Sequence, residues 1–483
     1  MEPLELESIV RHSGGSWISP APLPRLSVAE LGTDTRTLGN QSVFLALSGP
    51  NFDGHSFVEE ARRRGAVASV VKASRVAVLP PAGGPYIAVN EPLDALERLA
   101  RWNRDRLALT VVAVTGSVGK TSTKEFLATV LSGGFQVKSA PKSFNNRIGV
   151  AVTLLSARPE TEVLVLEMGT SGAGEISHLS RLAQPHKAVI TEIAPAHLEG
   201  LGDMDGVVEA KAEIFDGLLA GGSAFVRAGV LGFERFQRRA RGPFHTFGWK
   251  TGDISVTDCQ RIVLGHDARD PAASMEHGYH FTVNGKENFL LPVPGRHNVL
   301  NAAAAIAVAH ELGMSWELIR SQLATCRLPP LRLQVRSENG LVLVDDSYNA
   351  NPASMEAAIG EWESLGNADG RSRRVAVLGD MLEMGSQSRT LHQAVGERVA
   401  RAGARLVVTI GGDSRFLCEA CRSGGVGETA HFSSTAEALP FLKGHLRSGD
   451  CVLFKGSRRI GLDAAVKALR EWAREAFRAE AEA

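Results

Sequence analysis

A short glycine-containing turn after an apolar strand constrains the fold of this chain more than any other feature. Residues 114–121 read V-T-G-S-V-G-K-T and follow an apolar run at residues 109–114. Glycines allow backbone N–H groups to close around phosphate oxygens, and a helix that begins there adds the positive end of its dipole. A strand, this turn and a helix in that order predict a nucleotide site in a mostly parallel sheet.

Two residues of this turn are expected to bind different parts of a nucleotide. Lys120 is placed to reach the β- and γ-phosphates, and the Thr121 hydroxyl suits Mg²⁺. The usual P-loop has a further glycine where Val114 stands, so the motif is a shortened variant. The structural alternative is that these residues only cap the start of a helix and match the P-loop pattern by chance. The residues predicted to bind ATP here are Gly116, Ser117, Val118, Gly119, Lys120, Thr121 and Ser122.

Alternating strand and helix patterns divide the chain into three blocks and predict an α/β protein of three domains. Asn284 and Gly285, between two short apolar runs, predict a β-hairpin within the second block. The third block, which follows Pro329 and Pro330, resembles a dinucleotide-type domain. The predicted domains are a small α/β domain at residues 1–90, a P-loop domain with a mostly parallel sheet at 91–327, and a Rossmann-like domain at 328–483.

Composition excludes several classes of protein. The 53 basic residues balance the 53 acidic ones, so neither nucleic acid nor an anionic membrane is expected as a partner. Five cysteines are few and odd in number, unlike a disulfide framework, and no apolar run reaches the length of a membrane span. Cys418 and Cys421 have the spacing of a zinc or redox pair but favour one face of a helix. We expect a cytoplasmic monomer without a membrane span.

Two side chains that follow other strands of the predicted sheet are candidate metal ligands. Glu167 ends the apolar run at residues 163–166, and His197 comes after the run at 188–190. Parallel sheets bind ligands at the carboxyl ends of their strands, and phosphoryl transfer needs such groups around its metal. The structural alternatives are a strand-end glutamate paired with a surface base and an ordinary loop histidine.

Lys211 lies on the apolar stripe of a predicted helix, beside Val208, Ile214 and Phe215. A lysine in this position either extends its amine to solvent or stays partly buried with a lowered pKa. A neutral amine can react with CO₂ to form a carbamate, an anion that can face Mg²⁺. From the pattern alone, extension to solvent is favoured.

These motifs together resemble the Mur ligases over nearly the whole chain. The shared motifs of the second block are T-G-S-V-G-K-T-S at residues 115–122, F-N-N-R-I-G at 144–149, E-M-G at 167–169, A-H-L-E at 196–199 and A-K-A-E-I at 210–214. Four further motifs resemble the member that adds D-alanyl-D-alanine to a UDP-N-acetylmuramoyl-tripeptide. They are F-D-G-H at 52–55, D-D-S-Y-N-A-N-P at 345–352, L-G-D-M at 378–381 and K-G-S-R at 455–458.

The resemblance implies a role for each matching residue. Thr121, Glu167 and His197 serve the metal sites, and Lys211 matches a lysine that is carbamylated in several relatives, against the preference from pattern alone. Asn298 and Asn301 match the adenine-side motif, and Arg332 and Asp346 match groups that a closing domain adds to phosphate and ribose. The residues implied in binding the UDP-linked peptide or the second substrate are Thr35, Arg36, Asp53, Gly54, His55, Asn145, Asn146, Lys455 and Ser457.

Structural roles stay open for several of these residues. Asn298 can cap an alanine-rich helix, one of Asp345 and Asp346 can be purely structural, His55 can be a turn residue, and Lys455 can be an ordinary solvated lysine.

Four positions depart from the family pattern. Thr35 stands where Ser is more frequent, Ser143 and Glu192 where Asn is expected, and Leu331 where Gly is usual. Glu192 adds a negative charge near the expected phosphate site.

The expected reaction uses ATP and Mg²⁺ to activate a peptide carboxylate as an acyl phosphate, which the amine of D-alanyl-D-alanine then attacks. The rival readings are another ligase of the superfamily, such as one that adds a single amino acid or folylpolyglutamate synthase, and a noncatalytic nucleotide switch.

Overall fold

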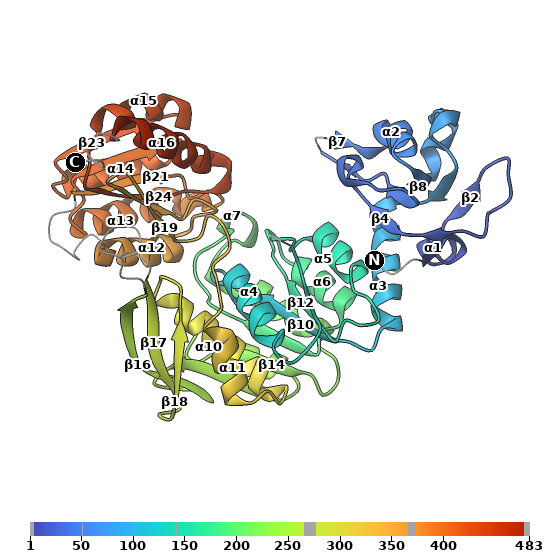
Figure 1. The fold of residues 1–483 in the computed structure, drawn as a ribbon, viewed down its shortest axis with the longest axis horizontal. Coiled ribbons are helices and arrows are strands. Elements are labelled where there is room, and N and C mark those ends of the chain that lie inside the picture. Colours follow the sequence, from blue (N-terminus) through green and yellow to red (C-terminus); the bar gives the residue numbers. More distant parts are fainter. Residues whose placement is uncertain (1–3, 51, 142, 265–276, 366–372, 478–483) are drawn as a thin grey trace.

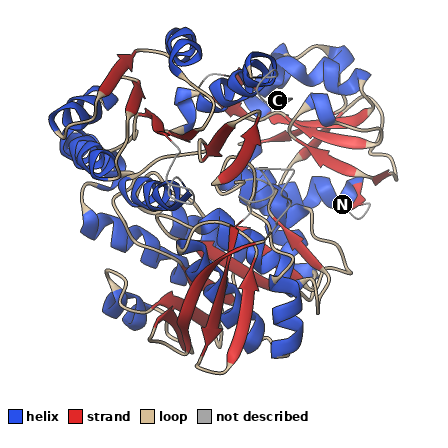
Figure 2. Cartoon of the chain, turned by 60° about the vertical axis from the view of Figure 1, so that its left-hand side comes forward, coloured by secondary structure: helices blue, strands red, loops and turns tan. Residues whose placement is uncertain are grey.

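The computed structural model describes residues 4–50, 52–141, 143–264, 277–365 and 373–477 (Figure 1). It contains three larger sheets with helices around them (Figure 2), which confirms the predicted α/β class. None of the helices in these ranges is long and apolar enough to cross a membrane.

The N-terminal part is built on a five-stranded sheet in the order β2-β9-β8-β5-β4, in which β2 alone runs antiparallel to its neighbour. Two short pairs, β1–β3 and β6–β7, lie beside it. Its elements are β1 (Leu4–Glu5), α1 (Leu6–Ser13), β2 (Ser16–Ile18), β3 (Ser27–Val28), β4 (Glu30–Gly32), β5 (Ser42–Leu45), β6 (Ser48–Gly49), β7 (Phe52–Asp53), α2 (Val58–Arg63), β8 (Ala66–Lys72) and β9 (Tyr86–Val89).

Helix α3 (Pro92–Arg106) joins this part to the central one, and Pro92 suits its first turn. The helix packs on α1 and on α5, so one apolar core continues from the N-terminal sheet to a face of the central sheet.

The central sheet has nine strands in the order β11-β12-β10-β13-β14-β15-β16-β17-β18, parallel as far as β16. Its strands are β10 (Thr110–Thr115), β11 (Val137–Ser139), β12 (Val163–Glu167), β13 (Lys187–Ile190), β14 (Ser223–Arg227), β15 (Phe244–Trp249), β16 (Ile254–Val263), β17 (His277–Val283) and β18 (Glu287–Leu291). Its helices are α4 (Lys120–Leu131), α5 (Arg147–Leu155), α6 (Glu175–Ala183), α7 (Leu198–Leu201), α8 (Met204–Ala212), α9 (Phe233–Arg239), α10 (His297–Glu311) and α11 (Trp316–Leu323).

Successive residues of β10 enter two different apolar cores. Val111 and Ala113 belong to the core shared with α3, whereas Val112 and Val114 pack against α4 and α10. Because strand side chains alternate between faces, this distribution means that helices cover both faces of the sheet. The predicted hairpin is confirmed: β17 and β18 pair antiparallel around Asn284 and Gly285, where φ is positive at both positions.

The C-terminal sheet has the order β19-β20-β24-β21-β22-β23, with β19 antiparallel to the rest. Its elements are β19 (Gln334–Glu338), β20 (Leu341–Asp345), α12 (Pro352–Leu365), β21 (Arg373–Gly379), α13 (Ser388–Arg401), β22 (Leu406–Ile410), α14 (Ser414–Ser423), β23 (Glu428–Phe432), α15 (Thr435–His445), β24 (Asp450–Lys455) and α16 (Leu462–Ala476). Cys418 and Cys421 are buried on one side of α14 and are free thiols, as their spacing along a helix predicts.

Candidate active site

A cavity of about 1320 Å³ lies where the P-loop meets the C-terminal sheet. It brings together most of the residues that the sequence singles out, from positions 117 to 455. Those that line it are Ser117, Val118, Gly119, Lys120, Thr121, Ser122, Asn145, Asn146, Glu167, His197, Asn298, Asn301, Arg332, Asp346 and Lys455.

The P-loop has the backbone that its glycines predict. Gly116 and Gly119 have φ values of +147° and +88°, and α4 begins at Lys120. A side chain at Gly119 would place its Cβ 2.4 Å from the Asn301 amide oxygen, so this position also needs a glycine for space. The Lys120 ammonium donates to the carbonyl of Gly116 at 2.7 Å. Burial lowers the pKa of Lys120, while nearby Glu167 opposes that shift.

Thr121 is the centre of a hydrogen-bonded chain that joins two sheets. Its hydroxyl donates to a Glu167 carboxylate oxygen at 2.9 Å and accepts from the Arg332 guanidinium at 2.8 Å. The Asn145 amide donates to the other Glu167 oxygen at 2.8 Å. Glu167 and Thr121 are buried, so a carboxylate, a hydroxyl and an arginine meet on the wall of the cavity.

The backbone around Arg332 is left-handed at both neighbours. Leu331 and Leu333 have φ values of +64° and +46°. This conformation is unfavourable for residues with a Cβ, which explains why glycine suits position 331 in the family pattern. The Arg332 guanidinium also lies over the Tyr348 ring, 4.4 Å from its centroid. Tyr348 was not singled out from the sequence, where only its place in the D-D-S-Y-N-A-N-P motif marks it.

His197 contacts the C-terminal part through a residue that sequence reasoning missed. Its Nδ1 is hydrogen-bonded to the Glu383 carboxylate, and the Glu199 amide donates to the Glu383 carbonyl at 3.1 Å. His197 and Glu383 both have positive φ. Burial lowers the pKa of His197, and the charge of Lys120 adds to the effect. Glu383 lies two residues beyond L-G-D-M, which is the signal that could have suggested it.

Lys211 is buried, with 1% of its surface exposed, so the extension to solvent that the pattern favoured is wrong. Within the part of the chain that the structure describes, its ammonium has no hydrogen-bond partner. Burial, and next the charge of Lys120, lower its pKa well below the ordinary value. Lys211 is not among the residues that line the cavity, but it is close enough to Lys120 and His197 for their charges to interact.

Asp346 and Lys455 form a pair on the C-terminal side of the cavity. The Lys455 ammonium donates to Asp346 at 2.6 Å and to the Asn349 carbonyl at 2.9 Å. Lys455 is 2% exposed, which contradicts the reading of an ordinary solvated lysine. Asp345 instead accepts from the Ser347 hydroxyl and is the structural member of the two aspartates. Asn351, also missed, lines the cavity and donates from its amide to the Ser117 carbonyl at 3.5 Å.

A smaller cavity of about 260 Å³ lies on the other side of Gly119 and Asn301. The Asn301 amide donates to the Asn298 side-chain oxygen at 2.9 Å, so the two residues share one helix face as their spacing predicts. Trp249 and Phe247 line this cavity. The Glu192 carboxylate is paired with Arg227 here. The negative charge that Glu192 adds is therefore compensated locally.

Other predicted residues lie outside the main cavity. The His55 ring is hydrogen-bonded to Asp53 at 2.7 Å and accepts from the Lys72 amide at 3.0 Å, so it ties its turn to the end of β8. Ser457 accepts from the Leu382 amide at 2.9 Å. The remaining ones are Thr35, Arg36 and Gly54, which lie in the N-terminal part, and Gly116 at the base of the P-loop.

Comparison with known proteins identifies the architecture. Family models match residues 27–104 (Mur ligase family, catalytic domain), 114–309 (Mur ligase middle domain) and 331–458 (Mur ligase, glutamate ligase domain). The UDP-N-acetylmuramoyl-tripeptide–D-alanyl-D-alanine ligase of Bacillus subtilis is 37% identical over 91% of this chain and 93% of its own length. The Escherichia coli enzyme of that name is 35% identical over 91% and 93%.

Solved structures of Mur ligases match the fold of this chain as well. A crystal structure of MurF from Acinetobacter baumannii matches with a TM-score of 0.85 and 30% identity, covering 98% of this chain and 99% of that one. MurF ligase from Thermotoga maritima, in complex with ADP, matches with a TM-score of 0.77 and 26% identity over 92% and 98%. With three family models along its length and relatives of this identity, the chain belongs to the Mur ligase family.

Proposed function

We propose that this chain is an ATP-dependent amide ligase that adds D-alanyl-D-alanine to a UDP-N-acetylmuramoyl-tripeptide, releasing ADP and phosphate, in peptidoglycan precursor synthesis. The observation that carries the proposal is the meeting of Thr121, Glu167 and Arg332 in one hydrogen-bonded chain beside Lys120. The relatives named above, which carry this activity in their names, support the choice of substrates.

The proposed chemistry has two steps. A carboxylate oxygen of the peptide bonds to the γ-phosphorus of ATP, and the bond to the bridging oxygen breaks to release ADP. The amine of D-alanyl-D-alanine then attacks the acyl carbon, loses a proton, and phosphate leaves from the tetrahedral intermediate. Lys120 and Arg332 bring two cations to the place where charge grows on the transferred group, and their fixed positions supply most of the rate.

The residues proposed to hold Mg²⁺ fit its chemistry. Magnesium prefers oxygen ligands, and the buried Glu167 carboxylate and Thr121 hydroxyl already face each other at 2.9 Å. His197 and Lys211, as a carbamate, complete the proposed set. Among the described residues no three His, Cys, Asp or Glu side chains form a metal-binding group, so the set depends on the hydroxyl and the carbamate. When bound, Mg²⁺ would neutralise phosphate charge.

The carbamate proposal for Lys211 rests on burial. Burial lowers the pKa of Lys211 well below the ordinary value, which favours the neutral amine whose lone pair can react with CO₂. The new N–C bond creates an anion and releases a proton. This anion would lie near the positive charge of Lys120 and would be attracted to it.

We assign binding of the UDP-linked peptide to the N-terminal part, ATP binding to the central part, and closure over the nucleotide to the C-terminal part, with boundaries near residues 90 and 327. Pro50, Ser117 and Asp346, one from each part, line the same cavity, which supports a working monomer. Because both nucleotide substrates are cytoplasmic, we place the reaction in the cytoplasm. Thr35, Arg36 and Asp53 are proposed to bind the UDP group.

Product analysis tests this function. One ADP and one phosphate should appear per amide formed, and only with ATP, the UDP-linked tripeptide and D-alanyl-D-alanine all present. AMP and pyrophosphate would indicate adenylation and refute the mechanism. A panel of acceptor amines separates this activity from that of a ligase adding single amino acids, and phosphate release without either peptide substrate would favour a nucleotide switch.

A further inference from the structure

The loop that leaves β12 and enters α6 forms one wall of the main cavity. Its lining residues are Gly169, Thr170, Ser171, Ala173, Gly174 and Glu175. Pro50 from the N-terminal part and Leu93 from α3 line the same cavity. Helix α6 packs on α3 and α5 (Figure 1), and α3 is the helix that joins the N-terminal part to the central one. The loop and the N-terminal part therefore border the same cavity.

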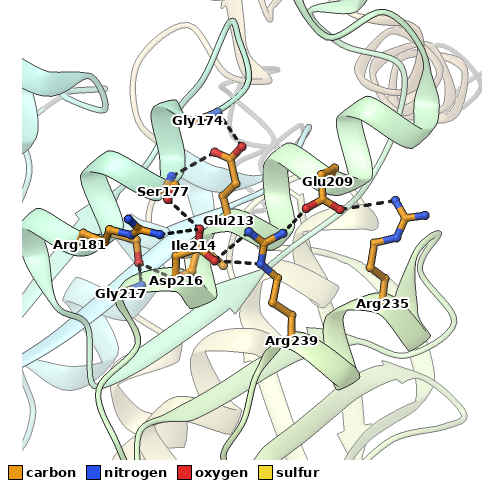
Figure 3. Close-up of polar contacts among 11 residues, drawn as sticks. Gly174, Ser177, Arg181, Glu209, Glu213, Ile214, Asp216, Gly217, Arg235 and Arg239 are labelled. Carbon is orange, nitrogen blue, oxygen red and sulfur yellow. Dashed lines mark hydrogen bonds and ion pairs between the residues drawn. The ribbon is translucent and has the colours of Figure 1, made fainter.

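Helix α6 has no cap of its own. Its N-cap residue is Gly174, which has φ +83° and no side chain to accept the free N–H groups of the first turn. Glu213, from the short helix η5 (Glu213–Gly217), supplies the missing acceptor. One of its oxygens accepts from the Gly174 amide at 2.6 Å and the other from the Ser177 amide at 3.0 Å (Figure 3). Glu213 thus holds the point where the loop becomes helix.

Further contacts fix η5 against α6. The Ser177 hydroxyl donates to Asp216 at 2.7 Å (Figure 3). The Ser180 hydroxyl donates to the Ile214 carbonyl at 2.5 Å. The Arg239 guanidinium in turn donates to Asp216 at 2.9 Å. Because these contacts lock η5 in place, the Glu213 carboxylate is presented to the loop from a rigid support.

The loop is also held from a second side. A Cβ at Gly200 in α7 would lie 1.9 Å from the Ser171 carbonyl oxygen, so α7 touches the loop backbone directly. On the loop itself, Glu175 accepts from the Ser171 amide at 2.8 Å and from the Thr170 hydroxyl at 3.0 Å. The loop therefore has little freedom to move away from the cavity.

We propose that Glu213 is a positioning residue that fixes the loop at residues 170–174 and thereby sets the affinity for the UDP-linked acceptor peptide. This inference rests on the proposed function. Glu213 is buried, with 6% of its surface exposed, and its two oxygens accept from backbone N–H groups at the end of the loop, so it supports the loop rather than lining the cavity itself. Its charge also opposes the lowering of the pKa of Lys211, which makes kcat a necessary readout of the test. Among the described residues no hydrogen bond or ion pair joins the Glu213 side chain to the P-loop or to Asn301, so we expect the affinity for ATP to be unchanged when Glu213 is replaced.

The test compares Glu213→Gln with Glu209→Gln in the full-length enzyme. Glutamine keeps the size of Glu213 but turns an NH₂ group toward an N–H donor. Loss of charge-assisted hydrogen bonds should raise the KM for the UDP-linked tripeptide about tenfold and leave the KM for ATP unchanged. Glu209 lies on α8 in the same network but is exposed, and its ion pairs within the described ranges are with Arg235 and Arg239, so its variant should keep both constants (Figure 3).

Each other outcome overturns the inference. Equal changes in both KM values, or a lower melting temperature with both unchanged, would make Glu213 merely structural. A fall in kcat alone would mean that it acts through Lys211. Should Glu213→Gln fail to fold, Gly200→Ala pushes on Ser171 and must raise the KM for the peptide selectively. A parent enzyme without ligase activity would instead refute the proposed function.

Discussion

Replacing Lys211 with methionine should stabilise the protein while it abolishes activity. The Lys211 side chain is 1% exposed, and burial lowers its pKa well below the ordinary value. A buried polar group in that situation costs about 1–3 kcal/mol, and methionine fills similar space without this cost. In CO₂-free buffer at pH 7, urea denaturation of Lys211→Met should therefore give a free energy of unfolding higher by about 1–3 kcal/mol.

The advantage of methionine should depend on pH in a definite direction. Because burial lowers the pKa of Lys211 well below 10.5, the unfolded chain binds a proton that the folded chain releases between the two values. Stability of the parent therefore rises with pH across this window. The gain from Lys211→Met should be largest below the folded pKa and shrink as the pH approaches 10.5.

A second lysine provides the matched control. Lys187 is also largely buried but donates to Glu311 at 2.7 Å. Lys187→Met removes one member of a pair and should lower stability, the opposite sign. A Lys211→Met variant less stable than the parent in CO₂-free buffer would refute the reasoning.

Activity provides the other half of this prediction. Lys211→Ala should be inactive, and acetate should restore part of the activity by placing a carboxylate where the carbamate is proposed. Lys211→Arg should not respond to acetate, because the guanidinium occupies that space and keeps a positive charge. Full activity in Lys211→Ala would remove Lys211 from the site, and an inactive variant that acetate fails to rescue would contradict the carbamate.

Three further outcomes follow from the site. Lys120→Ala should lower kcat by about 10²-fold or more with an unchanged circular dichroism spectrum, and near-normal turnover would end the P-loop assignment. Asp346→Asn should lower the free energy of unfolding by about 3–5 kcal/mol, because it leaves the buried Lys455 without its carboxylate. Leu331→Gly relieves a left-handed backbone conformation that costs leucine about 1–2 kcal/mol. The greater flexibility of glycine in the unfolded chain costs about 0.5–1 kcal/mol, so the urea midpoint of this variant should not fall.

Local patterns were enough to predict much of the fold. Apolar runs of the kind buried in parallel sheets mark β10, β12 and β22, and Asn284-Gly285 marks the hairpin. Strand β16 escaped detection because it is largely polar and its burial is irregular, so neither a continuous apolar run nor a clean alternation identifies it. Its strand character comes from pairing with β15 and β17.

The site could be predicted only where its chemistry is local. Lys120 and Thr121 follow from the turn that contains them, whereas Arg332 and Asp346 needed the family resemblance. Glu383 and Glu213 act across long separations in sequence, and no local pattern marks the groups they contact. The burial of Lys211 was also missed, because the apolar face of a single helix does not reveal which other elements pack against that face.

The contact between Arg332 and Thr121 makes charge delivery conditional on the arrangement of the sheets. Arg332 lies in the connection between α11 and β19, so any rotation of the C-terminal sheet away from the P-loop pulls on this arginine directly. The Arg332 guanidinium contacts the P-loop residue Thr121 only while the C-terminal sheet lies against the central part. Charge stabilisation by Arg332 therefore depends on contact between the central and C-terminal parts. A nucleotide bound to the central part alone would lack the arginine.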